Sequence, residues 1–264
     1  MSKPSGAIDM TQGKPINLML RFALPMMIGS IFQSLYSMVD SAVLGRFVGS
    51  HALAAIGATT STTGLILLLA TGVTSAISIV LSQYVGANDT DRVRKGIVAS
   101  GWITLLLGVV LGLISVFAAR PLMQLLKTPE DVIDMSVLYI QIVCGCGIAQ
   151  FAYNAAASIL RALGDSKTPL YFLILCSILN VILDLISVIG LNMGVAGVAV
   201  ATVGSQAISA AICILVMFRK YPDLMPKRHT LRPDMPVSLK IFGMGAQMAL
   251  QSLFLSVGMM AVSY

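Results

Sequence analysis

The sequence is poor in charged residues, which make up 11% of its 264 residues, whereas hydrophobic residues make up 57% and the mean hydropathy is +0.90. A soluble domain usually carries about 25% charged residues. A soluble chain of this length must cover its surface with polar side chains, however large its core is. The composition therefore excludes a soluble globular protein and predicts an exterior that faces lipid.

Cysteine and histidine are also scarce, with four and two residues respectively. All four cysteines lie within apolar runs, and the pair formed by Cys144 and Cys146 lacks the spacing and the further ligands of a zinc site. The sequence also contains no nucleophile elbow or phosphate-binding loop. We therefore expect no metal centre, no cofactor and no enzyme activity.

Long apolar runs dominate what is present. A run of about 20 residues crosses the hydrocarbon core as a helix, and only helices satisfy the backbone over such spans in lipid. The sequence therefore predicts an all-α membrane helix bundle with seven transmembrane helices. The predicted spans are 17–44, 57–81, 96–119, 132–159, 168–189, 195–218 and 239–262.

The basic residues lie on one side of these spans. Of the 17 Lys and Arg residues, all except Arg46, Arg120 and Lys127 lie at the N-terminus or in the segments after the second, fourth and sixth spans. Such a bias places these segments and the N-terminus in the cytoplasm. The net charge of +6 therefore reflects membrane topology, and we expect no nucleic-acid partner.

The longest connection, residues 219–238, is rich in proline and basic residues and separates six helices from one. Connections of this kind commonly join two bundles in transporters. We therefore expect residues 1–218 to form a six-helix lobe and residues 219–238 to form a cytoplasmic loop between lobes. Residues 239–264 would then be the first helix of a second lobe that is missing from this chain.

Two of the 11 acidic residues, Asp40 and Asp184, lie within apolar runs, where an ionisable group is costly and by default marks a function. Counting from the helix ends places both in the outer half of the membrane, within roughly 10 Å of the outer end. Thr202 reaches a similar depth from the other direction, and Asn180 lies one helical turn before Asp184. We expect these four residues to form one site for a proton or a hard cation such as sodium.

Burial disfavours the charged form of a carboxylate, and a second carboxylate nearby disfavours it further. Protonation of this pair near neutral pH would suit a proton-coupled carrier. The alternative is that each aspartate only bonds to neighbouring helices. Pro25 lies on the helix of Asp40 and should kink it. We hypothesise that protonation of Asp40 biases bending at this hinge, with a static kink as the alternative.

Several short segments resemble the multidrug and toxic compound extrusion (MATE) family. Together they cover residues 14 to about 260, and their combination is more specific than any one of them. The matching segments are VDSAVLG (39–45), LAA (53–55), QYVGA (83–87) and RALGDSKTP (161–169), together with Pro25, Asn180 and Asp184.

The resemblance implies half of a twelve-helix, two-lobe transporter in the plasma membrane, which for a bacterium is the inner membrane. Such a protein would be surrounded by membrane lipids and would export amphipathic organic cations in exchange for protons or sodium. The DinF-like branch carries a cation site in its amino-terminal lobe, whereas the NorM-like branch uses an acid on helix seven. Residues 239–262 contain no acid, which favours the DinF-like branch.

The resemblance also implies roles for individual residues. The proton or sodium site would comprise Asp40, Asn180, Asp184 and Thr202, with Tyr139 a lesser candidate. Side chains that could line a substrate cavity are Gln33, Tyr36 and Asn154. The identity of the substrate and the choice between proton and sodium stay open.

Three other kinds of membrane protein fit the sequence less well. A lipid-linked oligosaccharide flippase of the same superfamily should hold cationic side chains in its cavity, but the spans contain no interior Lys or Arg. A light-driven retinal pump needs a lysine in the middle of its last helix, whereas Lys240 lies at one end of the seventh span. A seven-helix receptor of the usual orientation would place its N-terminus outside, against the charge bias.

Overall fold

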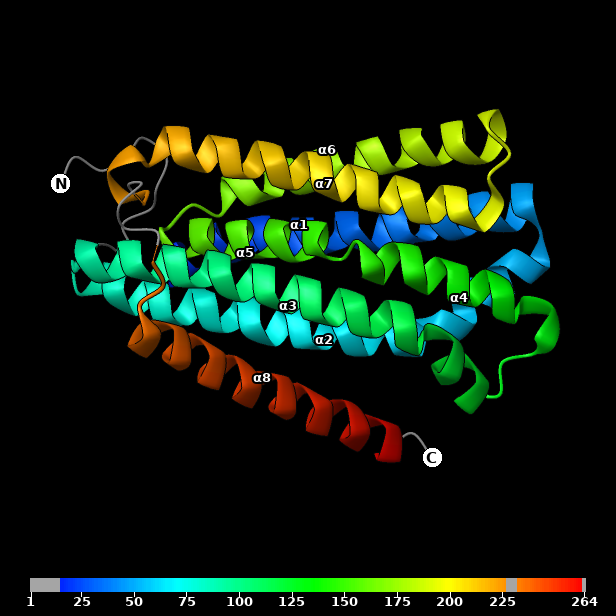
Figure 1. The fold of residues 1–264 in the computed structure, drawn as a ribbon. Coiled ribbons are helices and arrows are strands. Elements are labelled where there is room, and N and C mark those ends of the chain that lie inside the picture. Colours follow the sequence, from blue (N-terminus) through cyan, green and yellow to red (C-terminus); the bar gives the residue numbers. More distant parts are fainter. Residues whose placement is uncertain (1–14, 227–231, 263–264) are drawn as a thin grey trace.

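The computed structural model describes residues 15–226 and 232–262, and the regular structure of these residues is helical. The long helices lie side by side along one axis (Figure 1), which confirms the prediction of an all-α bundle. The α-helices are α1 (Pro15–Val43), α2 (Ser50–Gly86), α3 (Thr90–Leu125), α4 (Glu130–Gly145), α5 (Ile148–Ala162), α6 (Lys167–Leu185), α7 (Gly194–Lys220) and α8 (Met235–Val262). Shorter elements are the π-helical turns Leu44–Val48 and Ile186–Gly190 and the 3-10 turn Pro222–Leu224.

The lengths and the hydropathy of the helices are those of a membrane bundle. Within the described residues, four helices are long and apolar enough to cross it, and α4 and α5 make a fifth span if they are taken together. The four are α2, α3, α6 with its π-helical turn, and α7. The chain is thus a multi-pass membrane bundle. Helices α1 and α8 extend over the first and seventh predicted spans, and their crossing of the membrane stays a prediction.

The fourth predicted span, 132–159, is not one straight helix. It is divided into α4 and α5, which are bent by 43° at the intervening break. Glycines on both sides of Cys146 weaken the helix there, since glycine lacks a Cβ and costs more conformational entropy to order. The break also lies against α3, because a Cβ added to Gly112 would come within 2.9 Å of the Gly145 carbonyl oxygen. The backbones of α3 and α4 therefore touch beside the bend.

The connection between α7 and α8 is shorter than the predicted loop 219–238. Helix α7 continues to Lys220, and α8 already begins at Met235. Four of the basic residues that predicted the membrane orientation, Lys3, Lys14, Lys227 and Arg228, lie outside the described residues, as do the last two residues of the chain. The cytoplasmic position of the N-terminus and of this connection therefore stays a prediction.

Helix α8 lies along one edge of the bundle, where it packs on α2 and α3 (Figure 1). A Cβ added to Gly72 of α2 would lie 2.9 Å from the backbone nitrogen of Ala249 and from the carbonyl oxygen of Gly245. Such close approach requires small residues on both helices, as is common where helices pack in membranes. The Cβ of Ala249 lies at the same 2.9 Å from the position of that added Cβ, so the two helices approach each other closely here.

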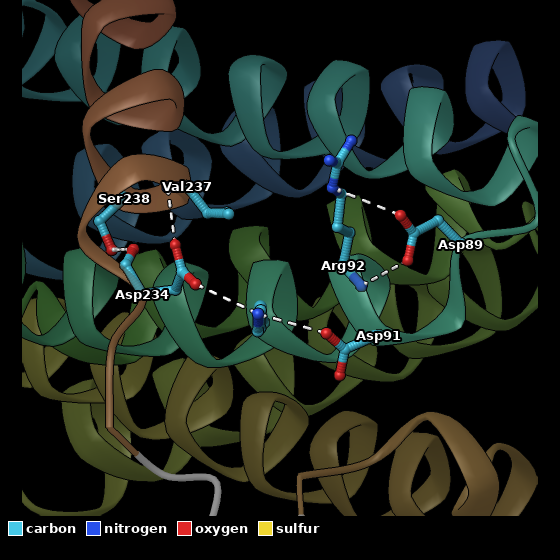
Figure 2. Close-up of polar contacts among 7 residues, drawn as sticks. Asp89, Asp91, Arg92, Asp234, Val237 and Ser238 are labelled. Carbon is cyan, nitrogen blue, oxygen red and sulfur yellow. Dashed lines mark hydrogen bonds and ion pairs between the residues drawn. The ribbon is translucent and has the colours of Figure 1, made fainter.

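An exposed polar cluster joins the start of α8 to α3. Lys95 forms ion pairs with Asp91 at 3.2 Å and with Asp234 at 3.5 Å (Figure 2). Asp234 also accepts a hydrogen bond from the backbone nitrogen of Val237 at 3.3 Å, which caps the first turn of α8. Solvent-exposed ion pairs contribute little to stability. Helix α8 is therefore attached mainly by apolar packing, through the close approach at Gly72 and through Val237 and Ile241, which are buried in the core.

The Gly72→Ala variant is expected to lose about 1–3 kcal/mol of stability, because the new methyl group would push the backbones of α2 and α8 apart. The matched control is Gly64→Ala on the same helix, where an added Cβ meets no atom within 4 Å. That control should be neutral or gain up to about 1 kcal/mol from helix propensity. Thermal unfolding of the purified protein in detergent would measure both, and equal midpoints would contradict the backbone contact.

Candidate functional site

The carboxylates of Asp40 and Asp184 are brought together by α1 and α6. These two helices pack against each other, and the π-helical turns that follow them are also in contact. Each aspartate lies in the last turn of its helix, directly before the π-helical turn, a distortion that often marks functional sites. Asp184 is fully buried and Asp40 is half-buried, and the two carboxylates are close enough to influence each other's charge.

Asn180 and Thr202 extend this site onto α7. Asn180, one turn before Asp184, is buried and donates a hydrogen bond from Nδ2 to the Thr202 hydroxyl at 3.5 Å. That hydroxyl in turn donates to the carbonyl oxygen of Val198 at 2.9 Å. The structure therefore brings together the four residues that the sequence placed at one depth, while their role in ion coupling stays a prediction.

Several oxygen atoms of this site have no hydrogen-bond partner in the part of the chain that the structure describes. They are Asp40 Oδ1, Asn180 Oδ1 and both carboxylate oxygens of Asp184. A buried acceptor without a donor costs about 1–3 kcal/mol, and a charged one costs more. The arrangement offers acceptors and no matching donors, so it fits a ligand that brings positive charge, either a proton or a hard cation.

Two tyrosines border the acidic pair. Tyr139 of α4 interacts with Asp40 and Asp184, in agreement with its predicted place near the ion site. Tyr36, predicted to line a substrate cavity, lies one helical turn before Asp40 and is influenced by its charge, and its place in a cavity stays a prediction. The spacing of four residues could have indicated this proximity from the sequence.

The other predicted residues lie further from the acidic pair. Gln33 is exposed on α1, where its side chain interacts with Tyr36, and Asn154 is half-buried on α5. Pro25 lies inside α1, which continues as one helix to Val43. A substrate cavity around Gln33 and Asn154, and a kink at Pro25, both stay predictions.

A second polar cluster, which the sequence did not predict, surrounds Asp165 in the loop between α5 and α6. Its carboxylate, which is fully buried, accepts hydrogen bonds from Lys220 Nζ and from the Thr168 hydroxyl, each at 2.6 Å. The backbone nitrogen of Thr168 donates at 3.1 Å and the Tyr221 hydroxyl at 3.4 Å. This cluster ties the start of α6 to the end of α7.

These contacts stabilise the ionised form of the Asp165 carboxylate. Burial alone would raise the pKa of Asp165, but the hydrogen bonds from Lys220 and Thr168 outweigh it and lower that pKa below its ordinary value. Burial, and then the neighbouring Asp165, raise the pKa of Tyr221. The sequence offered one signal for this contact, because at the start of a helix an Asp side chain commonly accepts a hydrogen bond from the backbone N-H three residues later. The pairing with Lys220 had no local signal.

Comparison with known proteins identifies the family. The MatE family profile matches residues 25–186. The probable multidrug resistance protein YpnP of Bacillus subtilis is 32% identical over 258 residues, which cover 97% of this chain and 57% of YpnP. The chain belongs to the MatE family. This is a family of membrane transporters and not of enzymes, and the receptor and light-driven pump considered from the sequence no longer apply.

Solved structures of MATE transporters share the fold. A MOP superfamily transporter from Pyrococcus furiosus superposes with a TM-score of 0.87 at 25% identity, covering 98% of this chain and 57% of that one. A MATE protein in its bent conformation gives a TM-score of 0.86 at 26% identity, covering 94% of this chain and 55% of that one. The chain spans about half the length of the curated relatives it matches. Its fold is thus that of half a MATE transporter.

The Asp165→Asn variant is expected to lose about 3 kcal/mol of stability, because it leaves the largely buried Lys220 ammonium without a counter-charge. The control is Asp134→Asn, which breaks the exposed pair with Arg120 and should cost about 0–1 kcal/mol. Thermal unfolding at pH 7 measures both losses, and similar losses in the two variants would contradict a buried pair.

The same pair predicts a pH dependence. Because the pKa of Asp165 is lower in the folded than in the unfolded protein, its stabilisation is present at neutral pH and is lost as the pH falls through the folded value. The difference in melting temperature between wild type and Asp165→Asn should therefore be constant above about pH 5 and shrink below about pH 4. A difference that does not shrink in acid would mean that Asp165→Asn destabilises the protein through altered packing and not through loss of the ionised carboxylate.

Proposed function

We propose that this chain is the amino-terminal part of a secondary active antiporter that exports amphipathic organic cations in exchange for protons or sodium. The observation that carries the proposal is the buried pair of Asp40 and Asp184 with its unpartnered oxygens. Two carboxylates at close range repel each other when both are ionised, so the pair favours binding of a proton or a cation. Drug-like compounds are the substrate class that family membership supports.

Occupancy of the site would control the position of α1. Asp40 and Asp184 lie on different helices, so a proton or cation held between them links α1 to α6. When it leaves, repulsion between the carboxylates favours separation of the two helices. A ligand shifts a conformational equilibrium only by binding one state more tightly, and an ion bound by both carboxylates does so. Pro25 gives α1 a place to bend during this change.

The choice between proton and sodium rests on the same oxygens. Sodium is a hard cation that prefers oxygen ligands, and Asn180 Oδ1 together with the carboxylates supplies them. A proton needs only the two carboxylates. Substitutions that remove the side-chain oxygens of Asn180 and Thr202 should therefore reduce sodium-driven transport more than proton-driven transport.

We further place the protein in the DinF-like branch, because α8 carries no acidic residue. In this proposal residues 1–218 form the first lobe, residues 219–238 connect the lobes in the cytoplasm, and residues 239–264 begin a second lobe. The protein would lie in the bacterial inner membrane with a cytoplasmic N-terminus. An oligosaccharide flippase is disfavoured, because its pyrophosphate ligand would be repelled by the acidic pair.

The Asp184→Asn variant is expected to abolish efflux of a fluorescent organic cation from vesicles that hold the protein from its complete reading frame. The amide cannot exchange a proton and removes one charge from a cation site. Proton and sodium gradients are imposed separately, and the gradient that drives wild-type efflux identifies the coupling ion. The exposed Asp134→Asn serves as the control and should retain the wild-type rate. Efflux that survives in Asp184→Asn would contradict the proposed site.

The Pro25→Ala variant is expected to slow gradient-driven efflux several-fold while leaving binding of the organic cation unchanged, because it restores the backbone hydrogen bond that proline removes. The control is Met26→Leu at the neighbouring exposed position, which should behave like wild type. Rates and binding are compared in the same vesicles. Unchanged rates in Pro25→Ala would mean that any bend at this residue is static.

A further inference from the structure

An apolar groove runs along the outside of the bundle between α3, α5 and α7. Its volume is about 450 Å³, and Thr104 is the one residue with a hydroxyl group in its lining. Ala155 and Ile159 of α5 form part of its floor and are buried, whereas Trp102 and Phe218 on its rim are about half exposed. The groove therefore opens to the surroundings of the bundle and not to the site of Asp40 and Asp184.

The surroundings at this level are lipid. Helices α3 and α7, which form the two sides of the groove, are long and apolar enough to cross the membrane. A Cβ added to Gly101, in the wall of the groove, would meet no atom within 4 Å, so the chain itself leaves room there. The groove thus has the apolar chemistry of the hydrocarbon core and open space along its wall.

One end of the groove carries a positive charge. Arg94 lies on α3 one turn before Ile97 and Val98, which line the groove, and so shares their helical face. Its guanidinium donates two hydrogen bonds, at 2.8 Å from Nε and 2.5 Å from Nη2, to the backbone carbonyl of Asp223. These bonds hold the guanidinium at Asp223, three residues before Pro226 of the lining, so Arg94 lies just beyond the end of the groove and does not itself line it.

The charge of Arg94 is not neutralised by its contacts. Both hydrogen bonds go to a neutral carbonyl oxygen, and across residues 15–226 and 232–262 no acidic side chain forms an ion pair with it. A guanidinium has five N-H donors in a planar fork that suits phosphate oxygens. The end of the groove with Arg94 is also the predicted cytoplasmic end, where basic pockets between helices commonly bind anionic headgroups.

We propose that this groove binds an anionic phospholipid, with one acyl chain along α3, α5 and α7 and the phosphate at Arg94. The remaining half of a MATE transporter is a less suitable occupant, because α8, where that half would begin, packs on α2 and α3 (Figure 1) and lines no part of the groove. The proposal does not depend on the transport function, since neither aspartate of the ion site lines the groove.

The chain offers a local probe of this groove. Trp102 on the rim is the single tryptophan of the 264 residues. Phospholipids with brominated acyl chains quench a tryptophan that they contact. The full 264-residue chain is reconstituted in vesicles with increasing fractions of brominated phosphatidylglycerol or brominated phosphatidylethanolamine, and quenching of Trp102 gives the relative affinity for the two lipids.

We expect phosphatidylglycerol to bind about fivefold more tightly than phosphatidylethanolamine, since one basic residue near an anionic surface contributes about 1 kcal/mol. The Arg94→Gln variant should lose this preference, and Arg94→Lys should keep part of it. Removal of a charge elsewhere, in Arg46→Gln, should change nothing. Gly101→Leu should fill the groove and weaken quenching by both lipids, whereas Gly101→Ala should not.

Other outcomes would overturn the proposal. Equal quenching by the two lipids in wild type would mean that the groove contacts lipid without selecting its charge. Absence of quenching by either lipid would mean that protein covers the groove. A preference for phosphatidylglycerol that survives in Arg94→Gln would place the headgroup elsewhere.

Discussion

The bilayer gives a buried polar group no water to bond to, so each such group must find a partner within the chain. The helices satisfy the backbone, and hydroxyl groups inside them donate back to carbonyl oxygens one turn earlier, as Thr74 does to Ala70 and Ser100 does to Gly96. Oδ1 of Asp40 and both carboxylate oxygens of Asp184 depart from this rule, since they are buried and lack donors among the described residues. Acidic acceptors without donors are where a mobile positive charge can be held.

The two polar clusters differ in how completely they are paired, and this separates their roles. Asp165 accepts hydrogen bonds from Lys220 and Thr168, and these bonds hold the start of α6 to the end of α7. Asp184 interacts with another carboxylate and with no donor among the described residues. A site of the first kind strengthens a fold, whereas a site of the second kind responds to what it binds.

Much of this could be predicted from the sequence, because lipid imposes simple rules. Hydropathy located the spans of α2, α3, α6 and α7, and counting from helix ends placed Asp40, Asp184, Asn180 and Thr202 at one level, since depth in a helix follows directly from residue number. The bend between α4 and α5 was missed because Cys146 and its flanking glycines lie within a continuous apolar run. The pairing of Asp165 with Lys220, 55 residues apart, depends on how α6 and α7 pack, which local patterns do not encode.

The contact between α2 and α8 bears on where a two-lobe protein can move. At Gly72 the backbone of α2 meets the Gly245 carbonyl oxygen and Ala249 of α8, so sliding or tilting α8 there would open a gap that neither helix can fill. A motion that separated α8 from α2 would therefore lose this packing, whereas a motion that carried α8 together with α2 would keep it.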